Sequence, residues 1–156
     1  MERALRRKLP HGRFVGVTKG RSQQMRAVRG RGNKTTETRF RSALVRAGIR
    51  GWSIAPQNIP GRPDFYFAKA RLAVFVDGCF WHGCPQCGHV PRTNSKFWRA
   101  KIERNRQRDR ATTAALRAEG LRVVRLWEHK LRENLAGCVG RVHSLLNKAH
   151  GRADSP

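Results

Sequence analysis

The sequence predicts an α/β domain in which a mixed β-sheet carries helices on both faces. Segments with the spacing of amphipathic helices alternate along the chain with short apolar segments that are typical of strands. The 156 residues suffice for a single hydrophobic core. Three cysteines gathered in one polar loop predict a metal-stabilised element attached to that core.

The first predicted element is a helix that follows Thr35 and Thr36, either of which can cap its N-terminus. Glu37 is favourable in the first turn, where the helix dipole attracts negative charge. Gly48 is expected to end the helix. Apolar residues recur at the i, i+3, i+4 and i+7 positions of one helical face, namely Phe40, Ala43, Leu44 and Ala47.

Three short strands are predicted next. The segment 52–55 is expected to form the first, and residues 59–63 form a turn. Residues 64–67 and 72–76 are expected to form a hairpin around Lys69. With its turn near residues 68–70, this hairpin brings the Asp64 carboxylate and the Val76 carbonyl near one position. Asp77 has the opposite parity, so its side chain is expected to face away unless a bulge redirects it.

The second half of the chain is predicted to contain a loop, a long helix, a strand and a last helix. The loop spans residues 77–94, and Ser95 can cap the Arg-rich helix, which runs to Ala118 and is closed by Gly120. Residues 121–127 read as an apolar strand. The last helix is amphipathic, with one face formed by Leu131, Leu135, Val139, Val142 and Leu146. The resulting αβββαβ order is similar to the core of restriction-endonuclease-like nucleases.

The charge and composition point to a nucleic-acid partner. The 34 Lys and Arg residues against 10 Asp and Glu give a net charge of +24, which predicts binding to a polyanion: DNA, RNA or an acidic membrane surface. No apolar run is long enough for a membrane span, and the basic N-terminus lacks the apolar segment of a secretory signal, so a cytoplasmic location is expected. In that compartment, four cysteines indicate metal binding or catalysis rather than disulfides.

The composition also divides the chain. Residues 1–33 are basic and Gly-rich and are expected to form a partly disordered arm, which contact with DNA could order. Residues 34–147 are expected to form the single domain. Residues 148–156 are expected to form a loose tail.

The cysteine loop predicts a structural zinc site. Cys79, Cys84 and Cys87 lie within nine residues, and tetrahedral Zn²⁺ requires one more ligand. His129, just after the strand 121–127, is the favoured fourth ligand. The competing candidates are Cys138, His89 and His82, of which Cys138 is expected to be an ordinary buried thiol. Three incidental core cysteines are the alternative, which the polar, Gly- and Pro-containing loop disfavours.

Two polar residues outside that set suggest catalysis. Asp64 opens an apolar strand after Pro63, a position suited to a Mg²⁺ ligand that holds a scissile phosphate; a turn aspartate is the alternative. His82 suits proton transfer near such a metal, or it is a zinc ligand or a surface histidine. Phe80 and Trp81 either pack on the loop, which the pattern alone favours, or wedge between bases.

These motifs together resemble the very-short-patch-repair (Vsr) mismatch endonucleases. The run Gly78-Cys79-Phe80-Trp81-His82 is highly specific, and the resemblance extends from about residue 22 to residue 142. The matching elements occur in the family's order: Met25-Arg26, Glu37, Pro60 to Phe65, Val74 to His82, Phe97 to Ile102, Asn105 to Asp109 and Val124 to His129.

The resemblance implies roles for several of the matching residues. Asp64 would be the principal Mg²⁺ ligand beside the Val76 carbonyl, His82 the catalytic histidine, and Glu37 a support of the site through metal-bound water. Structural zinc would be held by Cys79, Cys84, Cys87 and His129. Met25, Phe80 and Trp81 would insert beside a T·G pair. Water would attack the phosphodiester 5′ to the mismatched thymine and leave a 3′-hydroxyl and a 5′-phosphate.

The sequence departs from the family pattern in three places. Asp77 stands where the pattern has a second catalytic histidine, and a carboxylate is not a cationic proton donor at pH 7. If it reaches the site, Asp77 is expected to ligate metal or orient His82. Val76 replaces a threonine, which matters little if only the carbonyl is used. Cys84 and His129 exchange the residue types expected at the two zinc positions, and the spacing to Cys87 is one residue longer.

The expected protein is therefore a monomeric, nucleoid-associated enzyme that nicks double-stranded DNA beside a T·G mismatch. A related nuclease of other specificity, acting in phage defence or recombination, is one alternative. A zinc-stabilised DNA-binding module without cleavage is another, and the joint presence of Asp64, His82 and Glu37 argues against it. The sequence leaves open the flanking bases and methylation context read, and whether mismatch-repair factors recruit the protein.

Overall fold

A computed structural model of the chain describes residues 34–150 together with Gly16, Thr18 and Gly20. The predicted arm and tail therefore fall largely outside the described residues, except that the last helix continues through residues 148–150. The described elements are α3 (Lys34–Arg46), β1 (Phe65–Phe67), β2 (Leu72–Asp77), α4 (Ser95–Ala118), β3 (Arg122–Trp127), α5 (Glu128–Glu133) and α6 (Leu135–His150).

The three strands form one mixed sheet in the order β1-β2-β3, which confirms the predicted sheet type. β1 and β2 are antiparallel, with Phe65 opposite Val74, so the predicted hairpin is correct. β2 and β3 are parallel along their whole length, ending with Asp77 opposite Trp127. Because β2 lies between two strands and is covered on both faces, all six of its residues are buried.

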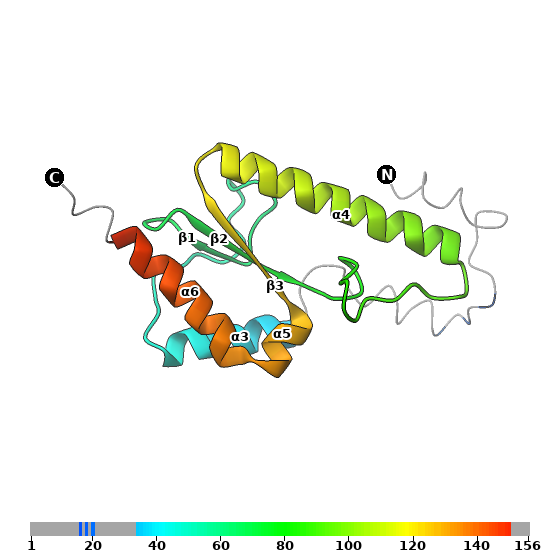
Figure 1. Cartoon of the computed structure of the whole chain (residues 1–156), viewed down its shortest axis with the longest axis horizontal. Helices are drawn as coiled ribbons and strands as arrows, with labels where there is room; N and C mark the ends of the chain where they lie inside the picture. The colour runs from blue at the N-terminus through cyan, green and yellow to red at the C-terminus, as the bar shows by residue number, and fades with distance from the viewer. Residues whose placement is uncertain (1–15, 17, 19, 21–33, 151–156) are drawn as a thin grey trace.

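Helices cover both faces of the sheet, as predicted (Figure 1). Alternate strand residues face opposite sides, so the sheet contributes to two apolar clusters. On one side, the side chains of Val74 and Leu126 pack with α3, α5 and α6, including Leu131 and Val142. On the other side, Ala73 and Phe75 pack with Leu116 of α4 and with Leu121.

The backbone at two glycines, one before β1 and one in the cysteine loop, approaches α4 closely. Gly61 has a φ of 73°, and a Cβ atom there would lie 2.2 Å from Cγ2 of Thr112 on α4. Gly83 has a φ of 62°, and its added Cβ would lie 2.6 Å from Cγ2 of Ile102. Both positions thus require glycine for two reasons, the left-handed backbone and the lack of space. The bounds predicted for α4 are correct, but the cap position is Asn94, with φ 56°, and Ser95 is the first helical residue.

The strand predicted at residues 52–55 is wrong. Only Ser53 pairs, through two reciprocal backbone hydrogen bonds of 2.9 Å with Tyr66. Positive φ angles at Gly51 (84°) and Ala55 (43°) turn the chain away on either side and prevent an extended strand. The segment instead contributes Trp52, whose ring packs edge-on against Phe65 and Phe67.

The ends of two predicted helices also differ from expectation. α3 begins at Lys34, so Thr35 and Thr36 lie within its first turn rather than at the cap, and Ala47 lies past its end and is exposed. The last amphipathic helix is two helices, because Asn134 (φ −142°, ψ 72°) breaks the chain between α5 and α6. The predicted apolar face nevertheless packs on the sheet from both pieces. Within the described part of the chain, no helix has the length and apolar character that crossing a membrane requires.

Substitution of Gly61 by Ala is expected to destabilise the fold by about 2 kcal/mol or more, from the left-handed backbone and the contact with Thr112. Gly140→Ala is the matched control, because it lies within α6 with no atom within 4 Å of the added Cβ, and it should stabilise the protein by about 0.5–1 kcal/mol. Urea unfolding of both variants measures the difference. Equal stability of the two variants would contradict the close packing of α4.

Candidate functional site

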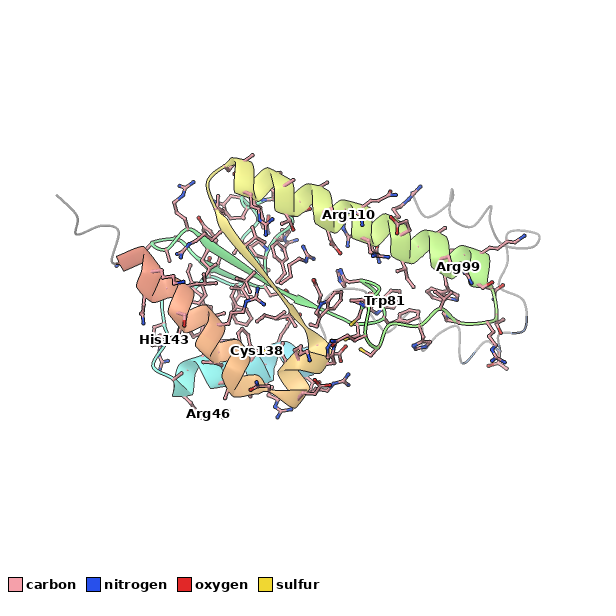
Figure 2. All side chains as sticks on the ribbon, viewed as in Figure 1. Arg46, Trp81, Arg99, Arg110, Cys138 and His143 are labelled. Carbon is pink, nitrogen blue, oxygen red and sulfur yellow. The ribbon has the colours of Figure 1, made fainter. Side chains whose placement is uncertain are left out.

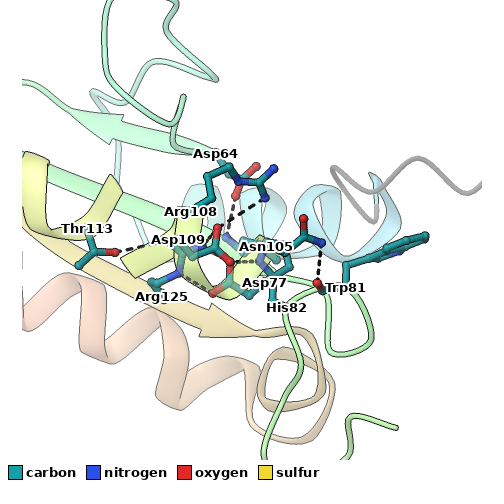
Figure 3. A network of polar contacts seen from close by, with 10 residues as sticks. Asp64, Asp77, Trp81, His82, Asn105, Arg108, Asp109, Thr113 and Arg125 are labelled. Atoms are coloured by element: carbon teal, nitrogen blue, oxygen red, sulfur yellow. Dashed lines mark hydrogen bonds and ion pairs between the residues drawn. The ribbon is translucent and has the colours of Figure 1, made fainter. Parts of the chain in front are cut away.

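Polar side chains from the sheet, the cysteine loop and α4 meet on the α4 side of the sheet, near the C-terminal ends of β2 and β3 (Figure 3). The chain places Asp64 just before β1, Asp77 at the end of β2 and Arg125 on β3. His82 comes from the cysteine loop and Asp109 from α4. Three of the ten acidic residues of the chain thus gather in one place, which is unusual for a protein of such positive charge.

Asp64 and Val76 are brought together as the hairpin register predicted. The Val76 amide donates a hydrogen bond of 2.6 Å to Oδ2 of Asp64. In a strand, the N–H and C=O of one residue point toward the same edge. The Val76 carbonyl therefore points to the edge of β2 on which Asp64 lies. A carboxylate and a backbone carbonyl at one location form an oxygen donor set of the kind that Mg²⁺ accepts.

The expectation that Asp77 faces away from the site is wrong. Asp64 and Asp77 both point to the α4 face, since Asp64 shares the parity of Tyr66 and Asp77 that of Phe75. No bulge is needed, because the β2–β3 register continues through Asp77. Val76 contributes to the site only through its backbone, which lies in the plane of the sheet. The face to which the Val76 side chain points therefore does not show on which face the site lies.

His82 is bonded to a carboxylate from α4. Its Nδ1 lies 2.5 Å from Oδ2 of Asp109, which fixes the ring with Nδ1–H as donor and leaves Nε2 for other contacts. Burial alone would raise the pKa of Asp109, but the hydrogen bond to His82 and the charges of His82, Arg125 and Arg108 outweigh it, so the pKa of this carboxyl is lowered. Asp109 is therefore ionised at neutral pH and suited to orient the imidazole.

Arg125 joins the buried carboxylate of Asp77 to the half-buried carboxylate of Asp109. Its Nε and Nη2 donate to both oxygens of Asp77, at 2.6 and 2.8 Å, and Nη2 also lies 3.2 Å from Oδ1 of Asp109. Burial opposes the positive charge, but the hydrogen bonds to Asp77 outweigh it and raise the pKa of the guanidinium. Because both Asp77 oxygens are occupied in this way, the arrangement does not favour the expected role of Asp77 as a metal ligand.

An aromatic cluster adjoins the site. The rings of Phe80 and Trp81 lie 5.0 Å apart, and Phe80 also packs against His89 and Trp98, at 5.6 and 5.3 Å. Asn105 of α4 donates a hydrogen bond of 2.8 Å to the Trp81 carbonyl and so fixes the loop beneath the helix (Figures 2 and 3). Phe80 and Trp81 pack on the loop, as the sequence pattern alone favoured. Both residues are half-buried, so each remains partly accessible to solvent.

The predicted zinc ligands converge on one point. Cys79, Cys84, Cys87 and His129 place all their ligand atoms within 4.8 Å of one another. Nδ1 of His129 lies 3.3, 3.5 and 3.5 Å from the sulfurs of Cys79, Cys84 and Cys87, and the sulfurs of Cys84 and Cys87 are 3.7 Å apart. Ligands bound about 2.3 Å from a tetrahedral zinc lie roughly 3.7 Å from one another. The four residues thus fit a closed tetrahedral site, which is structural.

The surroundings of this Cys₃His cluster support metal binding. Nε2 of His129 lies 2.7 Å from Oε1 of Gln86, a contact that leaves Nδ1 for the metal. Burial raises the pKa of the Cys79 thiol to about 12. Burial has the same effect on Cys84, but hydrogen bonds from the backbone of Cys87 and Gln86 lower its pKa. A cation among the sulfurs would stabilise all three thiolates.

The alternative fourth ligands have other surroundings. His82 is bonded to Asp109, and His89 packs against Phe80. Cys138 lies on α6 within the larger apolar cluster, as expected of an ordinary buried thiol. Glu37 is half-buried in the first turn of α3. Met25 lies outside the described residues.

Three residues of the site were missed by the sequence reasoning as functional candidates: Asp109, Arg125 and Gln86. Asp109 carried a signal, since a carboxylate on an Arg-rich helix is conspicuous in a chain with so few acids. The signal at Arg125 was weaker: it is a charged residue within an otherwise apolar stretch of strand. Gln86 had no signal, because its partner His129 is 43 residues away.

Known proteins match this chain over most of its length. The family model described as DNA mismatch endonuclease Vsr matches residues 16–88. The type II nicking enzyme V.NaeI of Lentzea aerocolonigenes is 40% identical, over 81% of this chain and 78% of its own length. The type II nicking enzyme V.XorIIP of Xanthomonas oryzae pv. oryzae is 39% identical, over 79% and 89%. The DNA mismatch endonuclease Vsr of Escherichia coli is 39% identical, over 72% and 71%.

The Cys₃His cluster predicts one tightly bound zinc ion per chain, which elemental analysis of the purified protein measures. Cys84→Ala should lose the zinc and much of the stability, because three ligands do not close the site. Cys138→Ala is the matched control, since it also removes a buried thiol but should retain the zinc. Zinc well below one per chain in the unaltered protein, or equal loss in both variants, would contradict the assignment.

Proposed function

Because the chain belongs to the Vsr family of DNA mismatch endonucleases and is a DNA endonuclease, we propose that it nicks one strand of duplex DNA on the 5′ side of the thymine in a T·G mismatch. The observation that carries the proposal is the meeting of the Asp64 carboxylate, the Val76 backbone and the His82–Asp109 pair near the C-terminal end of β2, on the α4 side of the sheet. Family membership also implies that the mixed sheet and its helices form a restriction-endonuclease-like core.

Asp64 and the Val76 carbonyl are the proposed Mg²⁺ ligands, with Glu37 supporting the site through water. Their oxygen donors suit the ion, and the hydrogen bond of 2.6 Å between the Asp64 carboxylate and the Val76 amide holds the two residues together. When bound, Mg²⁺ would neutralise charge that develops on the phosphate and favour deprotonation of the attacking water.

His82 is the proposed proton-transfer group. With Nδ1–H donated to Asp109, its Nε2 can accept a proton from water or return one to the leaving oxygen. Asp109 would stabilise the imidazolium that forms, because its lowered pKa keeps the carboxylate ionised at neutral pH. Asn105 and the close packing at Gly83 keep the loop that carries His82 against α4, so the imidazole is positioned before DNA binds.

Two surfaces are proposed to hold the DNA. Exposed arginines of α4, including Arg99 and Arg110, suit phosphate contacts (Figure 2). The half-buried rings of Phe80 and Trp81, together with Met25, are proposed to insert beside the mismatch. This insertion would identify the thymine on whose 5′ side the strand is nicked. Zinc would keep Phe80 in place, because Cys79 and Cys84 flank the aromatic residues. Action on DNA would place the enzyme with the nucleoid, where mismatch-repair factors could recruit it.

A second candidate keeps the chemistry and changes the target. Two of the relatives described above carry the name type II nicking enzyme. A sequence-dependent nick, or a nick at a different mismatch, would use the same Asp64, His82 and Asp109. Only the surface that recognises the DNA bases would differ, so a comparison of cleavage on different duplexes distinguishes the two candidate functions.

The proposal predicts Mg²⁺-dependent nicking of a duplex that contains a T·G mismatch, with the cut 5′ to the thymine and only on that strand. Matched duplexes and duplexes with other mismatches should be cut far more slowly, as measured by denaturing gel electrophoresis of end-labelled strands. Equal cleavage of matched DNA would favour the second candidate. Failure to cut any duplex in Mg²⁺ would contradict both.

Asp64→Ala is expected to abolish nicking while binding to the T·G duplex survives, because the change removes the proposed metal ligand and leaves the basic surface unchanged. Nicking rates and gel-shift affinities measure the two effects. Glu103→Ala is the matched control, since it removes an exposed carboxylate that pairs with Arg110 on α4, and it should nick at a normal rate. A normal rate in Asp64→Ala would show that the metal assignment is wrong.

A further inference from the structure

We propose that Arg125 is a positioning residue of the nicking reaction: its guanidinium holds the Asp77 carboxylate away from His82, so that Asp109 alone fixes the imidazole. This inference rests on the proposed function of the site. It assigns a role to a half-buried arginine and to Asp77, neither of which the proposed chemistry uses directly.

The inference starts from two carboxylates that approach one nitrogen. Nδ1 of His82 lies 2.5 Å from Oδ2 of Asp109 and 3.7 Å from Oδ1 of Asp77. This nitrogen carries one proton and forms one strong hydrogen bond, so the two carboxylates compete for it. The choice between them sets the plane of the ring and therefore the direction of Nε2.

Arg125 decides this competition through an asymmetric set of contacts. Its planar fork engages both oxygens of Asp77, at 2.6 and 2.8 Å, which is the strong bidentate geometry. It reaches only Oδ1 of Asp109, at 3.2 Å, and so leaves Oδ2 for His82. The same guanidinium thus occupies one competitor and steadies the other.

The guanidinium is itself held in place. It lies over the ring of Phe75, with Cζ 4.6 Å from the ring centre, and Nη1 is 3.4 Å from Oγ1 of Thr113 on α4. Phe75 is also the residue opposite Arg125 in the parallel β2–β3 ladder. The side chain of Arg125 is only 23% exposed, so its position is set by packing before substrate binds. A lysine at this position could not engage both oxygens of Asp77 and also reach Asp109.

Loss of Arg125 would leave the Asp77 carboxylate, only 5% exposed, without its cation. A buried carboxylate without a partner is costly, and Nδ1 of His82 lies only 3.7 Å from Oδ1 of Asp77. The exposed Arg108 lies 3.6 Å from Oδ1 of Asp109, the oxygen that Arg125 also contacts, so without Arg125 it would draw Asp109 outward. The imidazole would then turn from Asp109 toward Asp77, and Nε2 would leave its working direction.

The test compares four variants on the T·G duplex. Arg125→Met should lower kcat by about 10- to 100-fold with little change in KM, because misplacement of a reacting group has effects of this size. Asp77→Asn combined with Arg125→Met removes the competing carboxylate and should recover most of the lost kcat. Arg125→Lys keeps the charge without the fork and should lose part of kcat. Arg122→Met is the matched control: this β3 arginine donates to the carbonyls of Leu145 and Ala70, far from His82, and should keep normal kcat.

A second readout does not depend on cleavage. The proton on Nδ1 of His82, in its short bond to Asp109, should give a far-downfield proton resonance in the protein without DNA. Arg125→Met should shift or remove this resonance, and the double variant should restore it. If the unaltered protein fails to nick any duplex while the resonance behaves as expected, the proposed function fails, and only the control of the His82 orientation by Arg125 stands.

Three results would overturn the inference. These are an unmoved resonance with normal kcat in Arg125→Met, a double variant as slow as Arg125→Met, and an unchanged kcat in Arg125→Lys. The double variant and Arg125→Lys each lack the unpaired buried charge, so the test survives even if Arg125→Met folds poorly.

Discussion

The packing of one face of α4 is the constraint on which the rest of the structure depends. Side chains at helical spacing along this face perform different tasks: Ile102 meets the turn at Gly83, Asn105 binds the Trp81 carbonyl, and Asp109 binds His82. Farther along, Thr112 meets Gly61 and Leu116 enters the apolar cluster. Because a single rigid helix makes all these contacts, the hydrophobic packing of its C-terminal half fixes the position of Asp109, the partner of His82, in its middle.

β3 provides the second link, between chemistry and metal binding. Its parallel register with β2 sets Arg125 opposite Phe75 and ends at Trp127, two residues before His129. The guanidinium at Asp77 and the imidazole at the cysteines are therefore positioned by the same ladder of hydrogen bonds. Cys79 lies only two residues after Asp77, so the Cys₃His cluster and the candidate active site are both supported by β2 and β3.

Several features were predictable from the sequence because they depend on local chemistry. The bounds of α4, the hairpin of β1 and β2, and the Cys₃His set follow from periodicity, turn residues and the small number of possible metal ligands. The proximity of Asp64 and Val76 followed from counting residues around the turn. Local backbone angles explain two errors in the predicted secondary structure, since Gly51 and Ala55 turn the chain beside Ser53, and Asn134 divides the last helix.

The sequence by itself determined which chemical groups are available: the oxygen donors of the hairpin, the imidazole of His82 and the four metal ligands. Only the tertiary structure decided how these groups are paired. Asp109 reaches His82 across 27 residues of sequence, and Arg125 reaches Asp77 across 48. Such contacts depend on the angle at which α4 crosses the sheet and on the face to which each strand residue points. Neither can be derived from the spacing of residues along the chain. The pairing of the Asp109 carboxylate with the His82 imidazole is therefore evident only in the tertiary structure.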